Sequence, residues 1–312
     1  MTHTSDDNHL LECLKGIIAV PATPFNDQNL VDENALRRYI HMAIQDGVSG
    51  FLAPALAAEV YQLSQDERLN ILRIILEEVK GKIPVIGSAT AENRDGRQHA
   101  VEAINRLGCD GILVFIPFTD ENQYKQEVLE LSQQIDGFLM LQDWDFQGDG
   151  IPVSVIAELF EQIECFKSLK IEVAFAGRKY SAVLEACNHR IHVAGGWASN
   201  QMIEGLDRGV HAFMPTVLHS VYKRIYDLYQ KRDRAAAVQL FNTFLPILAF
   251  TRQHPEISIH FNKRFLVRLG IFDTHNVRIS GFPLDPIHIR LTDELIDSAL
   301  DLYNSVREMN NT

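Results

Sequence analysis

Short hydrophobic runs alternate with amphipathic helical patterns from residue 16 to residue 214. Apolar runs flanked by helical patterns are typical of strands that are buried on both faces of a parallel sheet. We predict eight such strands, at Gly16–Phe25 with an end at Pro21, Gly50–Ala53, Ile83–Gly87, Gly111–Ile116, Phe138–Leu141, Cys165–Glu172, Ile191–Gly195 and Val210–Met214.

The segments between these runs carry helix signals. Asp32 is placed to cap the helix after the first strand, and Ser64 with Glu67 forms a capping box for the next helix. Further helices are predicted at about Arg94–Leu107, Glu121–Ile135, from Pro152 onward, Lys179–Ala186 and Gln201–Gly209. Eight strand–helix units at a spacing of about 25 residues favour a closed (β/α)8 TIM barrel over an open doubly wound sheet.

After Val221 the pattern is helical only, with apolar stripes through Ala237–Phe250, Ile257–Leu269 and Leu295–Leu302. We therefore divide the chain into three parts. Residues 1–13 form a flexible lead, residues 14–220 form the barrel, and residues 221–312 form a C-terminal helical region that packs on the barrel as an appendage.

Composition narrows the classes of partner. The chain has 312 residues, 46% of them hydrophobic, and a formal net charge of −12. This supports one large core, and since no basic stretch offsets the charge, we expect no nucleic-acid partner and no anionic-membrane partner. The N-terminal segment lacks the apolar core of a signal peptide, and no apolar run has membrane-spanning length.

The four cysteines are widely separated and form no C-x-x-C pair, so they suggest neither a zinc site nor a disulfide framework. The histidines show no H-E-x-x-H motif or other metal-ligand spacing, and no Gly-rich nucleotide-binding motif is present. We therefore predict a cytoplasmic protein with reduced thiols and no bound metal.

Lys170 is the main candidate for chemistry, because it lies near the C-terminal end of the Cys165–Glu172 run. In a closed barrel, side chains at the C-terminal ends of strands face the active-site mouth. Partial burial there favours the uncharged amine, which can form a Schiff base with a carbonyl substrate. Alternatively, Lys170 extends to solvent or pairs with Glu172 and does no chemistry.

Several short motifs together resemble one family. They are Ala22-Thr23-Pro24-Phe25, Glu59 with Leu63-Ser64-x-x-Glu67-Arg68, Pro84-Val85-Ile86-Gly87, Gly108-x-Asp110-Gly111, Pro117, Lys170, and Gly195-Gly196. Over nearly its whole length the chain resembles the dihydrodipicolinate synthase and N-acetylneuraminate lyase family of class I, Schiff-base-forming lyases. The resemblance implies a barrel whose Lys170 reacts with a small-molecule carbonyl substrate without a cofactor, and a homo-oligomer, dimer or tetramer.

The chain departs from the family pattern at several places, among them the position near Gln147, where pyruvate-binding members of the family have an arginine. The family's G-T-T-G-E after strand two is replaced by Ala55-Leu56-Ala57-Ala58-Glu59, which lacks both hydroxyls. The family's tyrosine pair after strand four is replaced by Phe118-Thr119, and its Y-N at the end of strand five aligns with Gln142-Asp143. Because the family's tyrosine delivers protons, the proton relay cannot survive in its original form. The backbone amides of Leu56 and Ala57 are still available to bind a substrate carboxylate.

Three residues are candidates for the missing functions. Gln142 can orient the substrate, while Asp143 or Glu172 can move protons. Adjacent strand residues point to opposite faces, so only one of Gln142 and Asp143 enters the barrel, whereas Glu172 shares the side of Lys170. The alternatives are that Asp143 is a cap or loop carboxylate and that Glu172 pairs with Lys179 or Arg178.

Other side chains are assigned to substrate binding. Phe118, Thr119, Trp144 and Trp197 with the glycines Gly195 and Gly196 line the predicted pocket, and Phe146 lies nearby. So many aromatic residues suggest a pocket less polar than that of a pyruvate aldolase, unless some of them simply plug the barrel. Candidates for binding an anionic group are Arg94, Arg97, Arg178 and Lys179.

Two functions of different classes remain. The first is a lyase of aldolase or dehydratase type, in which Lys170 forms a Schiff base with the carbonyl of a 2-oxo acid or related compound and the proton relay is altered. The second is a non-catalytic small-molecule-binding or regulatory barrel, which the missing relay side chains favour. Reaction of Lys170 with a carbonyl compound would distinguish the two.

Overall fold

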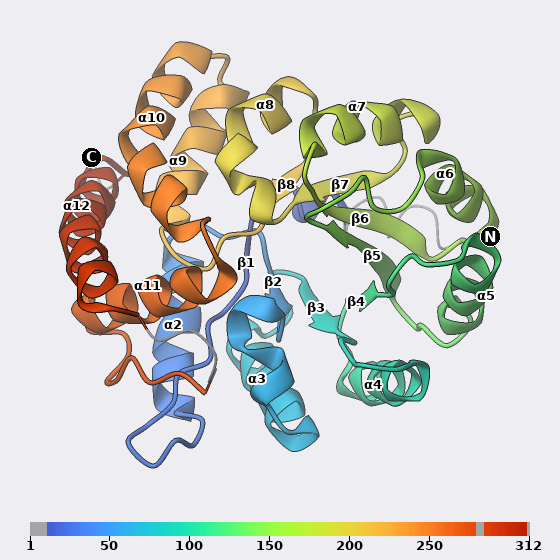
Figure 1. Ribbon diagram of the computed structural model, residues 1–312, viewed down its shortest axis with the longest axis horizontal. Coiled ribbons are helices and arrows are strands. Elements are labelled where there is room, and N and C mark those ends of the chain that lie inside the picture. The colour runs from blue at the N-terminus through green and yellow to red at the C-terminus, as the bar shows by residue number, and fades with distance from the viewer. Residues whose placement is uncertain (1–10, 279–283, 311–312) are drawn as a thin grey trace. The chain divides into compact units, whose positions relative to one another are not determined.

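The computed structural model describes residues 11–278 and 284–310, and eight parallel strands close into a barrel in chain order (Figure 1). The strands are β1 Gly16–Ala19, β2 Gly50–Ala53, β3 Val85–Ser88, β4 Gly111–Phe115, β5 Phe138–Asp145, β6 Phe166–Val173, β7 His192–Gly195 and β8 Ala212–Phe213. Helices alternate with the strands along the chain. The predicted (β/α)8 fold is therefore confirmed.

The described chain forms two compact units, which are treated separately. The first comprises the described residues up to Ile18, Ser49–Leu52 and Gly81–Met214, and it holds nearly all of the barrel strands. The second comprises Ala19–Val48, Ala53–Lys80 and the described residues from Pro215 onward.

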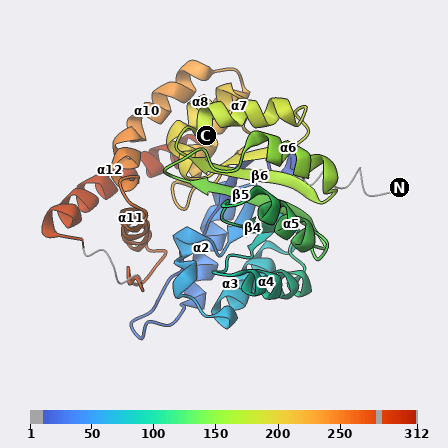
Figure 2. The same ribbon diagram turned by 45° about the vertical axis from the view of Figure 1, so that its right-hand side comes forward.

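The helices of the first unit are α4 Arg94–Leu107, α5 Glu121–Ser132, α6 Val153–Gln162, α7 Ala176–Ala186 and α8 Met202–Asp207. Asn93 and Asp120 cap α4 and α5 by accepting hydrogen bonds from backbone N–H groups, and Pro152 precedes α6. Successive helices from α4 to α7 pack side by side around the outer side of the strands (Figures 1 and 2).

Strand β5 is longer than the hydrophobic pattern predicts. The apolar run ends at Leu141, but hydrogen bonding to β6 continues to the pair Asp145 and Val173. The polar residues after Leu141 continue the strand because β6, with eight residues, offers backbone groups that need hydrogen-bond partners. Consequently Gln142, Asp143 and Trp144 lie on a strand rather than in the loop that follows it.

The second unit contains α2 Glu33–Gln45, α3 Gln65–Val79, α9 His219–Gln230, α10 Arg234–Thr251, α11 Pro255–Arg268 and α12 Pro286–Asn310. The predicted caps are present, since Asp32 accepts from the N–H of Ala35 and Ser64 forms a reciprocal capping box with Glu67. The short turns η1 Leu56–Ala58 and η2 Val60–Gln62 precede α3.

Most of the predicted flexible lead, residues 1–10, lies outside the described residues. The three-part division at residues 13 and 220 stays a prediction. Within the described residues, none of the helices combines the length and the hydrophobicity that a bilayer crossing requires.

Candidate active site

Lys170 lies on β6 and is buried, with 5% of its surface exposed. Its Nζ is 3.1 Å from Oε2 of Glu172, which is also buried at 7% exposure. The two residues are two positions apart on one strand, so their side chains emerge on the same face. An amine and a carboxylate are therefore in direct contact inside the first unit.

Gln142 completes this cluster from the neighbouring strand. It pairs with Lys170 in the register of β5 and β6, and its Nε2 donates a 2.6 Å hydrogen bond to Oε2 of Glu172. The same carboxylate oxygen thus faces both the lysine and the amide. This geometry fixes the carboxylate beside Nζ, where it can accept or donate a proton.

Gly196 bounds the cluster from the end of β7. A Cβ at this position would lie 2.1 Å from Oε1 of Glu172 and 2.5 Å from Cε of Lys170. Gly195 faces the other way, where a Cβ would lie 2.9 Å from the hydroxyl of Tyr180. The two glycines are therefore needed for close packing, and Gly196 in particular leaves room for the reactive pair.

Asp143 is not brought to Lys170. Its Oδ2 is 2.5 Å from Nζ of Lys179, and its Oδ1 accepts a 2.9 Å hydrogen bond from the N–H of Ile151. Burial raises the pKa of Asp143, and the charge of Lys179 opposes that rise. Since Lys179 also donates to the carbonyl of Asp149, the pair holds the segment between β5 and α6.

Three of the four cations predicted to bind an anionic substrate group already have carboxylate partners. Lys179 pairs with Asp143 as described, Arg94 pairs with Glu130, and Arg97 pairs with Glu127 at 2.5 Å. Arg178 is exposed. Each pairing lowers the attraction that the cation can offer to a ligand.

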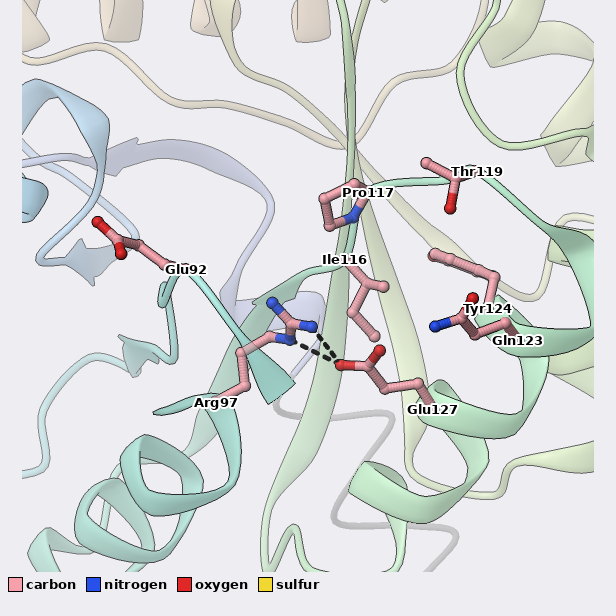
Figure 3. Close-up of a pocket in the computed structure, with 8 residues that line it drawn as sticks. All are labelled: Glu92, Arg97, Ile116, Pro117, Thr119, Gln123, Tyr124 and Glu127. Atoms are coloured by element: carbon pink, nitrogen blue, oxygen red, sulfur yellow. Dashed lines mark hydrogen bonds and ion pairs between the residues drawn. The ribbon is translucent and has the colours of Figure 1, made fainter. Parts of the chain in front are cut away.

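Thr119 lies at the rim of a pocket of about 190 Å³ at the end of β4 (Figure 3). The buried Arg97–Glu127 pair forms part of its lining, together with the ring of Tyr124. The ring of Phe118 packs edge-on against Tyr124 with centroids 5.2 Å apart. The structure therefore gathers Phe118 and Thr119 around Tyr124, which the sequence pattern did not mark as a site residue.

Trp144 lies on the same face of β5 as Gln142, two positions away. Its ring contacts Phe115 on β4 and Phe146 edge-on, with centroids 5.4 and 5.3 Å apart. These three rings form an aromatic cluster. Phe115 ends an apolar strand, so nothing in the sequence separated it from an ordinary core residue.

Trp197 begins the turn η3 Trp197–Gln201, and its side chain lies outside the described part of the structure.

Leu56 and Ala57 belong to the second unit, in turn η1, and their role in binding stays a prediction. Within that unit Glu59 follows the turn in a left-handed backbone conformation and is buried. Its carboxylate pairs with the buried Lys263 and accepts a 2.7 Å hydrogen bond from the N–H of Arg278. Burial lowers the pKa of Lys263 to about 8. Lys263, which is buried like Lys170 and Lys179, lies on the helix α11, and nothing in the sequence pattern marked it as a candidate site residue.

A closed parallel barrel with a buried lysine on strand β6 is one architecture in which class I lyases bind carbonyl substrates through a Schiff base. The comparison with known families agrees. The family model described as the Dihydrodipicolinate synthetase family matches residues 13–278, and the chain belongs to this family of lyases.

Individual relatives are distant. The chain is 25% identical over 241 residues to a 4-hydroxy-tetrahydrodipicolinate synthase of Pelobacter propionicus, covering 75% of this chain and 81% of that protein. It is 32% identical over 105 residues to an N-acetylneuraminate lyase of Enterobacter sp. strain 638, which is 34% of this chain and only 35% of that enzyme. The solved 4-hydroxy-tetrahydrodipicolinate synthase of Methylacidiphilum fumariolicum SolV superposes with a TM-score of 0.86 at 18% identity, covering 94% of this chain and 98% of that one. At this identity the superposition shows the fold alone.

Proposed function

We propose that the protein is a lyase of aldolase or dehydratase type in which Lys170 forms a Schiff base with the carbonyl of a 2-oxo acid or related compound. The observation that carries the proposal is the buried contact between Nζ of Lys170 and Oε2 of Glu172. A buried amine beside a proton acceptor is what nucleophilic attack on a carbonyl requires. Membership of the family supports the same reaction class.

The proton bookkeeping of imine formation fits this pair. Glu172 removes a proton from the Lys170 ammonium, and the free amine attacks the carbonyl carbon to form a C–N bond. The protons that Glu172 receives are returned to the carbonyl oxygen, which leaves as water. The lysine nitrogen starts with three protons and ends with one in the iminium, and water carries away the other two. The iminium then serves as the electron sink for cleavage, condensation or dehydration.

Glu172 is the residue that we assign to the altered proton relay. Gln142 cannot transfer protons at neutral pH, but its amide orients the Glu172 carboxylate and offers an oxygen to the substrate. Asp143, which we considered for the same task, is paired with Lys179 and is assigned instead to holding the segment after β5. Trp144 and Gly196 are proposed to contact the substrate from β5 and from the end of β7.

Reductive trapping tests the proposal. The protein is incubated with pyruvate and a panel of larger 2-oxo acids, ketones and aldehydes, reduced with borohydride, and analysed by intact mass and peptide mapping. We expect one adduct, on Lys170, that disappears in Lys170→Met. Lys167→Met, on the same strand, is the matched control and should keep the adduct. Absence of an adduct on Lys170 across the panel would contradict the proposal.

The same experiment addresses the second candidate function, a non-catalytic binding or regulatory barrel. The specific observation in its favour is the replacement of the relay hydroxyls by Ala55–Ala58 and Phe118. Ligand binding with no adduct on Lys170, and with affinity unchanged in Lys170→Met, would support that function.

Two further expectations belong to the proposal. We expect a homo-oligomer, a dimer or tetramer, as the resemblance to the family implies, and light scattering after size exclusion measures it. We also expect a cytoplasmic location, for which the four widely separated cysteines are the support. Fractionation of cells that express the protein tests the location.

A further inference from the structure

The pocket of about 190 Å³ at the end of β4 takes no part in the chemistry proposed for Lys170 (Figure 3). Its walls come from α4, from the segment that follows β4 and from α5, and neither Lys170 nor Glu172 lines it. We infer that this pocket binds a small organic cation, a primary ammonium on a short carbon chain. The inference does not depend on the proposed Schiff base.

The carboxylate of Glu127 is the central group of the pocket. The residue is buried, with 7% of its surface exposed. Both hydrogen bonds that Arg97 donates to it, from Nε at 2.8 Å and from Nη2 at 2.5 Å, end on the same oxygen, Oε1. The other oxygen, Oε2, receives no hydrogen bond from the described residues, and it points away from Arg97 (Figure 3). A carboxylate oxygen in such a place needs a donor, which has to come from the pocket as water or as a ligand.

The charges around the pocket favour a cation. Of the eight described residues that line it, Glu92 and Glu127 are acidic and Arg97 alone is basic. Because Arg97 is already paired with Glu127, the carboxylate of Glu92 at the exposed rim is an excess negative charge. Burial raises the pKa of Tyr124, and the carboxylates of Asp143 and Glu127 raise it further. An ammonium group reduces this negative potential, whereas an anionic ligand adds to it.

Volume and lining restrict the cation to a small one. About 190 Å³ is the volume of about six molecules of liquid water, and it is smaller than the ~300–1,000 Å³ of pockets for drug-sized ligands. Ile116 and Pro117 offer carbon surface, and the exposed Thr119 and Gln123 offer a hydroxyl and an amide oxygen. A primary ammonium has three N–H donors and no acceptor, so it matches the carboxylate of Glu127 and these oxygens.

Propan-1-amine, propan-1-ol and propanoate are matched probes. Each has three carbons, and at pH 7 they are a cation, a neutral molecule and an anion. Binding to the full chain is followed by saturation-transfer NMR of the ligand protons at constant ionic strength, with no carbonyl compound present. We expect a Kd on the order of 1 mM for propan-1-amine, binding of propan-1-ol that is at least about tenfold weaker, and no measurable binding of propanoate.

Two variants locate the binding. Gln123→Lys places an ammonium group at the exposed rim and leaves the Arg97–Glu127 pair untouched, so propan-1-amine should bind at least about tenfold more weakly. Gln126→Lys is the matched control, because it makes the same change of charge at an exposed position of α5 that does not line the pocket. This variant should keep the wild-type affinity.

A loss of affinity confined to Gln123→Lys would support the inference. An equal affinity for propan-1-amine in all three proteins would overturn it, and so would an equal loss in both variants, because the effect would then follow the net charge of the protein. Absence of binding to the wild-type protein, or binding of propan-1-ol as tight as that of propan-1-amine, would also overturn it. None of these results bears on the Schiff base at Lys170, which reductive trapping tests separately.

Discussion

The backbone of Gly196 lies directly against the carboxylate of Glu172, so that a Cβ on residue 196 would fall 2.1 Å from Oε1. Real Cβ atoms do not approach oxygen so closely, and the carboxylate has little freedom to move because Gln142 and Lys170 contact its other oxygen. A single methyl group at Gly196 therefore acts on the geometry of the reactive pair as well as on the stability of the fold.

Gly196→Ala is expected to slow labelling of Lys170 at least about tenfold while lowering the free energy of unfolding by about 1–3 kcal/mol. The added methyl group displaces the Glu172 carboxylate from Nζ of Lys170, and this slows proton transfer between them. Gly81→Ala is the matched control: Gly81 has a positive φ and open space around it, so alanine strains the backbone there without touching the site. If both variants label at the wild-type rate, Gly196 has no part in the site.

Glu172→Gln is expected to reduce the rate of imine formation at Lys170 by about 10²-fold or more with any carbonyl compound that labels the wild-type protein. Glutamine keeps the size of the side chain but cannot carry protons between Nζ and the carbonyl oxygen. Single-turnover labelling with cyanoborohydride measures the rate, and Glu161→Gln, an exposed glutamate, is the control. A variant that forms the imine at the wild-type rate would remove Glu172 from the relay.

The sequence predicted the barrel because the hydrophobic periodicity of each element and the spacing of the strand–helix units can both be read from short stretches of the chain. The placement of Glu172 beside Lys170 follows from the period of two along a single strand. The partner of Asp143 does not, because it depends on how the segment after β5 folds back and brings Lys179 within 2.5 Å. The role of a carboxylate that follows a predicted site residue in the sequence therefore depends on tertiary contacts, which the sequence pattern does not show.

The extent of β5 was also beyond the sequence pattern. Hydrophobicity stops at Leu141, yet the backbone continues to pair with β6 as far as Asp145. Backbone hydrogen bonding is independent of side-chain polarity, so a strand can extend through polar residues where its neighbour offers partners. The aromatic contacts of Trp144 with Phe115 and Phe146 depend on this extension.

Asp143→Ala is expected to destabilise the protein by about 3–5 kcal/mol, because it leaves the buried ammonium of Lys179 without its carboxylate. Urea unfolding measures the loss, and labelling of Lys170 should persist in the folded fraction. The double variant Asp143→Leu with Lys179→Met should recover most of the stability, since it removes both charges.

Asp149→Ala is the control for this pair. Only the backbone carbonyl of Asp149 accepts from Lys179, so the side chain is dispensable and the change should stay within about 0.5 kcal/mol. The assignment fails if Asp143→Asn leaves the stability unchanged but abolishes labelling of Lys170, because that result would return Asp143 to proton transfer.

The stability of the protein is expected to fall as the pH is lowered from about 6.5 to about 4, in part because of His192. This residue is 3% exposed, its Nδ1 is 2.8 Å from Oγ of Ser168, and its ring stacks on that of His211. Burial, with a smaller effect of His211, lowers the pKa of His192 to about 3. His219 in the second unit also has a pKa lowered to about 3, by burial.

The sign follows from proton binding. Below about pH 6.5 the unfolded chain takes up a proton at each of these histidines, whereas the folded chain leaves them neutral down to about pH 3. The unfolded state therefore binds more protons in this range, and the free energy of unfolding drops by up to about 1.4 kcal/mol per pH unit for each histidine. His192→Asn removes one of these two proton-binding side chains. The slope of the free energy of unfolding against pH should therefore become shallower by that amount. Urea unfolding of the wild-type and variant proteins at several pH values between about 4 and 7 measures the slopes, and an identical slope in His192→Asn would show that His192 is not held neutral by the fold.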